Sequence, residues 1–393
     1  AKYTGFETLD TTGGQGTFNL SFLAGETAVS QGALAGAVSY TSAAAGTGLT
    51  MTASPGQTTA YALQNATGSE DALSVTLSSA AALTGGTLTA NAIENITIVA
   101  TDTNTVAHVD TLTLAASSLK SLTIQGNAGL TLTNTDTTVT SINAASATGP
   151  FTTTTGNFAA AATISGSATA INTVDFSNAA TKGVTYVGGA GNDVITGQNG
   201  QVNTVTLGNG VNSYTHAGSA GIQTVTGGTG VDTITGGTAN DVIVGGGGAD
   251  QITGNAGADS ITVSGTTSKL FNAAVGDSGT NTSTTIQTSQ LTSTFDVITG
   301  VAAGTTYQLF TNTTALTATN NANLAGVDNQ VVFAKGTYDS GAGTFTYATN
   351  GTDTAMTYDT TVGGGTNYET VILVGYAQAA TTAISGAGLI TFA

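Results

Sequence analysis

Single apolar residues, each with polar residues on either side, recur at short intervals between residues 187 and 262. Neighbouring side chains of a strand point to opposite faces, so each of these residues predicts a short strand with one inward side chain. The short intervals leave room only for such a strand and a tight turn. This apolar ladder consists of Ile195, Val205, Tyr214, Val225, Ile234, Ile243, Ile252 and Ile261.

The most regular part of the ladder is residues 227–262, where four nonapeptides follow one another without a break: GGTGVDTIT, GGTANDVIV, GGGGADQIT and GNAGADSIT. Each has glycine at position one, aspartate at position six and isoleucine at position eight. Glycine permits a tight turn that a Cβ would forbid, and such a turn directs carbonyl oxygens inward beside the aspartate. Carboxylate and carbonyl oxygens are the ligands that calcium prefers. We expect two nonapeptides per turn of a coil, so that Asp232 stacks with Asp250 and Asp241 with Asp259.

Upstream, the same repeat continues in a decayed form. VGGAGNDVIT (187–196) is a good copy with Asp193, and three further units with longer spacers follow it. Their acidic position holds Asn203, Asn212 and Gln223, whereas their apolar position is kept. A flexible glycine-rich linker would not keep an apolar ladder in register. We therefore predict that the coil continues through this stretch while its metal sites weaken or vanish.

Residues 71–186 contain short runs in which two apolar residues are separated by one polar residue. Such pairs line one face of a strand, and short runs with polar corners favour rungs of a parallel β-solenoid. A β-sandwich would need longer strands and clearer hairpin signals. The predicted strands are 72–79, 94–101, 110–116, 120–127, 130–136, 139–146 and 172–178.

After residue 262 the nonapeptide pattern stops, and the remaining chain predicts a β-rich cap that covers the open end of the solenoid. Residues 294–310 predict two strands about a turn, and 369–376 a buried strand. Residues 343–359 predict a hairpin with Asn350–Gly351 at its bend, in which Phe345 and Tyr347 lie opposite Met356 and Tyr358.

The sequence thus predicts an all-β chain in four parts. A β-rich N-terminal segment (1–70) precedes solenoid rungs (71–186), a calcium-binding β-roll (187–262) and the C-terminal β cap (263–393). Two prolines among 55 glycines, with abundant threonine and alanine, agree with many short strands and turns.

Charge narrows the class of function. The 393 residues include 22 acids, five lysines and no arginine, which gives a net charge of −17. Without a basic patch to neutralise phosphates, nucleic-acid binding is not expected. The acid excess suits an extracellular protein that binds divalent cations. Cysteine is absent, and no apolar stretch is long enough for a transmembrane segment.

Catalytic motifs are missing, and we expect no enzyme. A zinc protease needs His-Glu-x-x-His, whereas the two histidines here, His108 and His216, lie far apart in the sequence and near no other expected ligand. Residues 276–279, Gly-Asp-Ser-Gly, resemble the nucleophile loop of chymotrypsin-like proteases but have no histidine and aspartate partners, so a turn is favoured. Two alternatives stay open for Asp277 and Asp296: each binds an ion beyond the repeats, or has a local structural role.

The strand-rich stretch 111–149, the GGAGND-type repeats, NAAVGD (272–277) and ETVILVGY (369–376) together carry a resemblance. From about residue 70 onward the chain resembles RTX proteins, and in particular the C-terminal part of Caulobacter-type bacterial surface-layer proteins. The resemblance implies a β-solenoid with embedded Ca²⁺ sites, and self-assembly into a two-dimensional lattice on the cell surface. It also implies type I secretion through an uncleaved signal within about the last 80 residues.

The calcium ligands implied by this resemblance are five aspartates and neighbouring loop carbonyls. Asn203, Asn212 and Gln223 depart from the pattern and put those three loops in doubt. The expected partners are further copies of the chain, and any contact with cell-surface polysaccharide would use a region outside it. The alternative is an RTX adhesin or a biofilm-matrix spacer module. The ligand residues are Asp193, Asp232, Asp241, Asp250 and Asp259, with Gly188, Ala190, Gly227, Thr229, Gly236, Thr238, Gly245, Gly247, Gly254 and Ala256.

Overall fold

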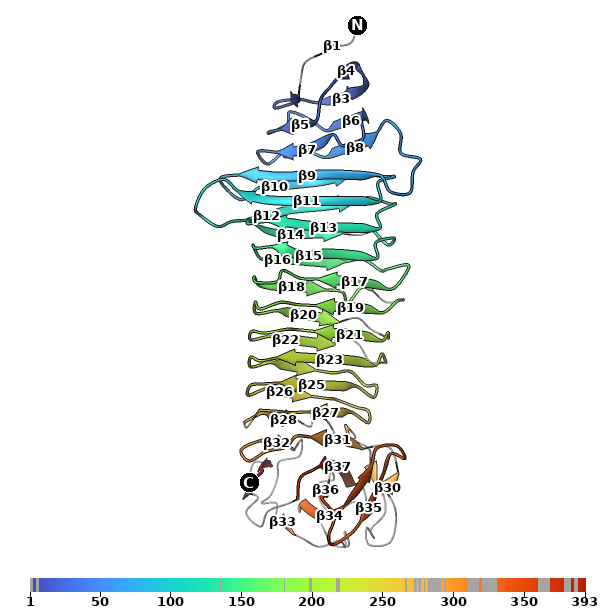
Figure 1. Ribbon diagram of the computed structural model, residues 1–393, viewed down its shortest axis with the longest axis vertical. Coiled ribbons are helices and arrows are strands. Elements are labelled where there is room, and N and C mark those ends of the chain that lie inside the picture. The colour runs from blue at the N-terminus through green and yellow to red at the C-terminus, as the bar shows by residue number, and fades with distance from the viewer. Residues whose placement is uncertain are drawn as a thin grey trace. The chain divides into compact units, whose positions relative to one another are not determined.

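The computed structural model forms two compact units, Ala1–Gln201 and Val202–Ala393. Strands dominate both units (Figure 1). The prediction of an all-β chain built as a parallel β-solenoid is confirmed. The structure describes residues 3–4, 7–134, 136–179, 181–197, 200–216, 220–265, 267–271, 274, 277–278, 280–281, 291–292, 295–309, 318–319, 331–359, 368–377, 383–384 and 388–393.

In the first unit, successive strands join two parallel sheets in turn, so that each pair of strands makes one rung of the coil. One sheet contains β2 (Thr8–Asp10), β5 (Ala28–Gln31), β7 (Gly48–Met51), β9 (Ala72–Ser79), β11 (Asn95–Asp102), β13 (Ser121–Gly126), β15 (Ser141–Ala147), β17 (Ala162–Ser165) and β19 (Val184–Val187). The other contains β3 (Gly16–Asn19), β6 (Val38–Ala43), β8 (Thr59–Leu63), β10 (Thr84–Thr89), β12 (Val109–Ala115), β14 (Gly129–Asn134), β16 (Phe151–Thr155), β18 (Asn172–Asp175) and β20 (Val194–Gly197).

Inward side chains form continuous columns along this unit. On the first sheet, equivalent residues of successive strands pair in register, and each is at most 2% exposed. Stacking like on like buries apolar surface at every rung, which is the main stabilising term for such a coil. This column contains Leu73, Ile96, Leu122, Ile142, Ile164 and Tyr186.

The N-terminal end of the unit has a short parallel pair, β1 (Tyr3–Thr4) and β4 (Leu23–Ala24). Before β4 lies a 3-10 turn, η1 (Leu20–Phe22), which begins after Asn19, whose side chain accepts a hydrogen bond from Ser21 N. Within the described residues, no helical segment has the length and apolar character that a membrane crossing needs.

The second unit repeats the two-sheet arrangement. One sheet contains β21 (Asn203–Thr206), β23 (Gln223–Gly228), β25 (Val242–Gly246), β27 (Ser260–Thr262), β31 (Asp296–Thr299) and β37 (Tyr368–Val374). The other contains β22 (Ser213–His216), β24 (Thr233–Thr235), β26 (Gln251–Thr253), β28 (Lys269–Phe271), β32 (Thr306–Gln308) and β39 (Leu389–Thr391). The remaining strands are β29 (Thr280–Asn281), β30 (Leu291–Thr292), β33 (Ala318–Thr319), β34 (Val331–Asp339), β35 (Thr344–Tyr347), β36 (Asp353–Asp359) and β38 (Ala383–Ile384).

The predicted apolar ladder is confirmed, because all eight of its residues are at most 4% exposed. Stacking also continues beyond residue 262. Ile298 follows Ile261 on one sheet, and Leu270 follows Ile252 on the other.

The predicted hairpin within 343–359 is wrong. Strands β35 and β36 both pair antiparallel with β34, which the hairpin prediction left out. Phe345 therefore lies opposite Tyr338, and Met356 opposite Phe333. The buried strand predicted at 369–376 is confirmed as β37, which pairs with both β31 and β36.

The four-part division of the chain stays a prediction. Rungs stack across residue 70, because Leu49 of β7 pairs with Val75 of β9. The two compact units are divided at residues 201 and 202 instead.

We predict that Ile243→Ala lowers the free energy of unfolding by about 2–5 kcal/mol, because the lost side chain leaves a cavity in the ladder. Ile243 is fully buried, whereas its neighbour Val242 is 41% exposed on the outer face. Val242→Ala is therefore the matched control, with an expected change below about 1 kcal/mol. Urea titration followed by circular dichroism, with calcium present, measures both. Equal losses in the two variants would contradict the inward placement of Ile243.

Candidate metal centre

The aspartates of the four nonapeptides stand directly before strands, at the corners of the second unit. Asp232 N donates to Asp250 Oδ1 over 3.0 Å, and Asp241 N donates to Asp259 Oδ1 over 2.8 Å. We call this series of bonds the aspartate ladder. It confirms the predicted stacking of residues 18 positions apart, with one column on each edge of the coil.

Position one of each nonapeptide must be glycine for a steric reason. A methyl group on Gly227 would lie 2.4 Å from Asp232 Oδ2, and one on Gly254 would lie 2.1 Å from Asp259 Oδ2. Gly236 and Gly245 have the same relation to Asp241 and Asp250. Each loop is therefore closed tightly around the second carboxylate oxygen of its own aspartate.

The residues at positions one and three differ in exposure. The glycines at position one are buried, whereas the residues at position three are exposed or partly exposed. The latter are Thr229, Thr238, Gly247 and Ala256.

Two of the four nonapeptide aspartates have a carboxylate oxygen without a hydrogen-bond partner. Oδ2 of Asp232 and of Asp241 accepts a backbone N–H from Gly228 and Gly237. Oδ2 of Asp250 and of Asp259 accepts none, although both residues are at most 1% exposed. A buried carboxylate oxygen without a partner is costly, and a bound cation removes that cost. The donor set of these loops therefore fits a hard cation such as calcium.

Electrostatics lead to the same conclusion. Burial raises the pKa of Asp232, Asp241 and Asp250 above the usual value. The pKa of Asp259 rises to about 8, through burial first and then through the negative charges of Asp241 and Asp277. Each rise means that the ionised form is unfavourable without a nearby positive charge.

Asp193 belongs to the first unit and is already well supplied with donors. Asn172 donates to Oδ1 from both its backbone and its side chain, and the Tyr186 hydroxyl donates to Oδ2 over 2.9 Å. Of its predicted loop neighbours, Gly188 is partly exposed and Ala190 is exposed. Asp193 thus depends less on a cation than the other four aspartates do.

The loops that lack aspartate contain an amide group in its place. Asn212 Nδ2 donates to the carbonyl oxygens of Gly208 and Gly210, over 3.0 and 3.5 Å. Gln223 Nε2 donates to Gly221 O, and Asn203 Nδ2 donates to Gln223 Oε1. In these loops an amide NH₂ donates hydrogen bonds to oxygens that a cation would otherwise bind. This agrees with the doubt about metal binding there.

The family comparison agrees with this geometry. Residues 185–201 and 218–261 match the model of the RTX calcium-binding nonapeptide repeat, in four copies. The chain carries RTX calcium-binding repeats. Calcium is the ion that these repeats bind, and such repeats are typical of secreted proteins. Among curated proteins, none is significantly similar to the chain.

One further aspartate continues the ladder, namely Asp296, for which ion binding and a local structural role were both left open. Asp259 N donates to Asp296 Oδ1 over 2.9 Å, although 37 positions separate the two residues. The available signal was the string Asp-Val-Ile-Thr at 296–299, which is identical to residues 193–196. The separation of 37 positions from Asp259 breaks the nine-residue period, so that period alone did not assign Asp296 a place in the ladder.

His108 is not isolated, contrary to expectation. Its Nδ1 lies 2.5 Å from Asp102 Oδ1, and its Nε2 lies 3.2 Å from Asp110 Oδ1. The two carboxylates approach opposite ring nitrogens and so do not converge on one point. Among the described residues, no three acidic or histidine side chains form a group that could hold a metal ion. His216 is buried, which lowers its pKa and favours the neutral ring.

We predict that the calcium-free protein loses stability as the pH rises from about 4 to about 8. The pKa of Asp259 is about 8 in the folded chain and near the usual value of 3.8 when unfolded. Between these values the folded chain binds more protons, so the free energy of unfolding falls with rising pH. Melting temperatures of dialysed, calcium-free protein test this. Asp259→Asn should flatten the fall, and an equally steep fall in that variant would contradict the assignment.

We also predict that Asp241→Ala and Asp250→Ala each weaken calcium binding at least about tenfold, because each removes a negatively charged ligand. Asn212→Ala is the matched control at the same loop position, and should change calcium affinity less than about twofold. Isothermal titration calorimetry measures all three variants. Equal weakening by Asn212→Ala would show that its loop also holds metal.

Proposed function

We propose that the protein is a structural subunit which self-assembles, in a calcium-dependent way, into a two-dimensional surface-layer lattice on a bacterial cell. One observation carries this proposal: the outer faces of the sheets have few charges, while acidic residues are concentrated in the calcium-binding loops. Such a subunit has regular faces on which copies can pack, together with a means of making those faces rigid.

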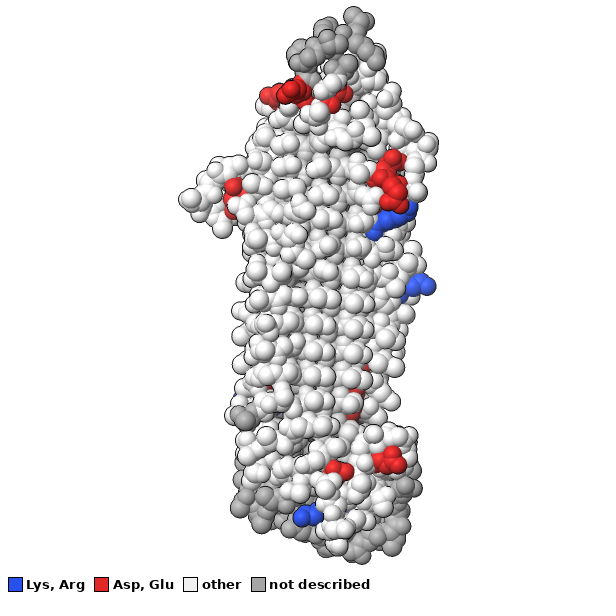
Figure 2. Space-filling view, in the orientation of Figure 1, with Lys and Arg blue, Asp and Glu red and all other residues white. Residues whose placement is uncertain are grey.

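The outer faces are suited to packing against identical copies. Figure 2 shows that charged side chains form only a few small groups on the face in view. On the second sheet of the first unit, outward threonines pair in register from strand to strand, which produces an uncharged column. Copies that present such faces meet little like-charge repulsion, despite the net charge of −17. The column contains Thr111, Thr131, Thr152 and Thr173.

The calcium-binding loops would supply rigidity. Asp232, Asp241, Asp250 and Asp259 would hold calcium together with carbonyls of the residues at positions one and three, and Asp193 would do so in the first unit. Calcium, when bound, supplies the positive charge that the buried carboxylates require. The aspartate ladder fixes the carboxylates in place, so that binding at one loop stiffens the next. Without the ion, mutual repulsion of the ionised carboxylates favours loosening of the coil.

Folding that depends on calcium also suits export of the chain from the cell. A chain that stays loose at the low calcium level of the cytoplasm, and folds outside, is compatible with passage through a narrow channel. We propose type I secretion, with the signal within about the last 80 residues, as the resemblance to surface-layer proteins implies.

Electron microscopy of the purified chain tests the proposal. We expect ordered sheets in about 1 mM calcium, within the range typical of extracellular calcium sites, and none in chelator. The double variant Asp241→Ala/Asp250→Ala is the control and should not form sheets at that concentration. Dispersed particles that bind calcium but never order would instead support the adhesin or biofilm-matrix spacer. A wild-type chain that binds no calcium would overturn the calcium dependence itself.

A further inference from the structure

The aspartate ladder extends past the matched repeats into the C-terminal strands of the second unit. β27 pairs in parallel with β31, with Ser260 opposite Val297, which places Asp296 opposite Asp259. The bond from Asp259 N to Asp296 Oδ1 repeats the one from Asp241 N to Asp259 Oδ1. Asp296 therefore occupies the position of a fifth nonapeptide aspartate in this unit.

The loop that belongs with Asp296 comes from another part of the chain. Ser278 forms a parallel bridge with Gly257, inside the loop of the last nonapeptide. This bridge brings the preceding residue, Asp277, beside that loop, where its Oδ2 accepts the Ala274 N–H over 2.8 Å. Asp296 N donates to Ser278 Oγ over 2.8 Å. Two separate segments thus rebuild a repeat that elsewhere is continuous.

Four buried carboxyl groups lie near enough to this junction to influence one another electrostatically, although no three of these described residues form a group that could hold one ion. Asp259, Asp277, Asp296 and Glu369 are each at most 6% exposed. Burial raises the pKa of Asp296 well above the usual range, and the negative charges of the other three raise it further. Independently of these charges, Asp259 Oδ2 has no hydrogen-bond partner. Burying this much negative charge is unfavourable unless a cation binds.

We propose that a calcium ion binds at this junction, held by the carboxylates of Asp259 and Asp277 together with backbone oxygens. Asp296 is a positioning residue, because it bonds to the backbone of Asp259 and to the side chain of Ser278. Two carboxylates suffice for such a mixed site, since calcium accepts carbonyl oxygens and water as further ligands. The inference rests on the proposed function in one respect, namely that calcium is the ion.

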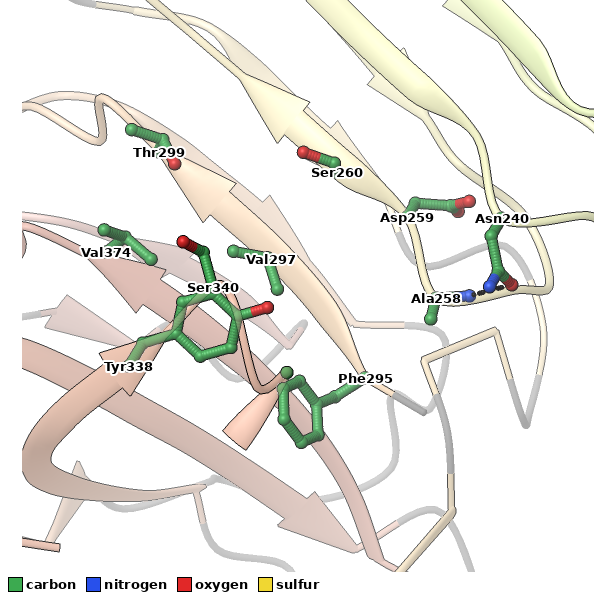
Figure 3. Close-up of a pocket in the computed structure, with 11 residues that line it drawn as sticks. Asn240, Ala258, Asp259, Ser260, Phe295, Val297, Thr299, Tyr338, Ser340 and Val374 are labelled. Carbon is green, nitrogen blue, oxygen red and sulfur yellow. Dashed lines mark hydrogen bonds between the residues drawn. The ribbon is translucent and has the colours of Figure 1, made fainter. Parts of the chain in front are cut away.

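The site has a route from solvent. A pocket of about 430 Å³ is lined by Asp259 and Asn240, and by Phe295, Val297 and Tyr338. Figure 3 shows Asp259 and Asn240 at one end of the pocket, away from the two aromatic rings. An ion can therefore reach Asp259 after the coil has formed.

The position of the site gives it a role. Ser278 Oγ donates to Thr370 O of β37 over 2.6 Å, and the Tyr358 hydroxyl of β36 donates to Glu369 Oε2 over 3.1 Å. β31 itself pairs with β37. A calcium ion here would brace the joint between the nonapeptide coil and the C-terminal strands, so that β36 and β37 become ordered only when calcium is present.

Calcium counting on the full chain tests the inference. By equilibrium dialysis, Asp277→Asn should bind about one ion fewer than the wild type, since an amide is a much weaker ligand than a carboxylate. Asp339→Asn, at an exposed position of β34, is the matched control and should bind as many ions as the wild type. By hydrogen exchange, calcium should protect residues 368–377 in the wild type and in Asp339→Asn, but not in Asp277→Asn.

Two variants of Asp296 distinguish its positioning role from the effect of its charge. Asp296→Asn keeps an oxygen that can accept the Asp259 N–H and should retain the ion, whereas Asp296→Ala should lose both the ion and the protection. An unchanged ion count in Asp277→Asn overturns this inference alone, whereas a wild type without bound calcium overturns the proposed function.

If Asp277→Asn does not fold, terbium bound to the wild type gives a second measurement. Terbium emission excited through tyrosine should fall in Tyr358→Phe, because Tyr358 contacts the junction through Glu369. Unchanged emission at an equal terbium count would overturn the inference.

Discussion

The fold of the second unit depends on carboxylates buried in tight loops. Each aspartate of the nonapeptides accepts a backbone N–H from the preceding turn, so that carboxylate and coil fix one another. Glycine at position one lets the loop close on the second oxygen. This tight closure excludes water from the carboxylate, so its negative charge is costly without a nearby cation. Calcium binding is therefore coupled to the folding of these loops.

The polar oxygens of the loops need a partner, and the chain supplies one in two ways. In one, an amide replaces the acid: Asn172 and Asn212 each donate to two carbonyl oxygens of their own loops and need no ion for this. In the other, an aspartate places a buried negative charge in the loop, and this charge favours a bound cation. We therefore expect the first kind of loop to form without calcium and the second kind to respond to it. Buried apolar residues accompany both kinds of loop, so the fold extends further than the metal sites do.

The charge distribution follows from this division. In the second unit, aspartates that would repel one another on a surface lie inside loops, where a divalent ion can neutralise them. The outer faces of the sheets have few charged residues and many threonines. A protein with few charges and a large acidic excess can therefore present packing faces that are close to neutral, which is what a lattice of identical subunits requires.

The sequence by itself determined the features that depend on local geometry. Strand alternation fixed the inward residues, and the nine-residue period fixed which aspartates stack, because both are set within one turn of the coil. Tertiary structure decided whatever depends on segments far apart in the chain. β35 and β36, which were expected to form a hairpin, each pair with β34, a strand that precedes both in the chain. A loop folded back to place His108 between Asp102 and Asp110. Asp277 and Asp296 came together because a repeat can be assembled from two separate segments, and no periodicity along the chain records such a contact.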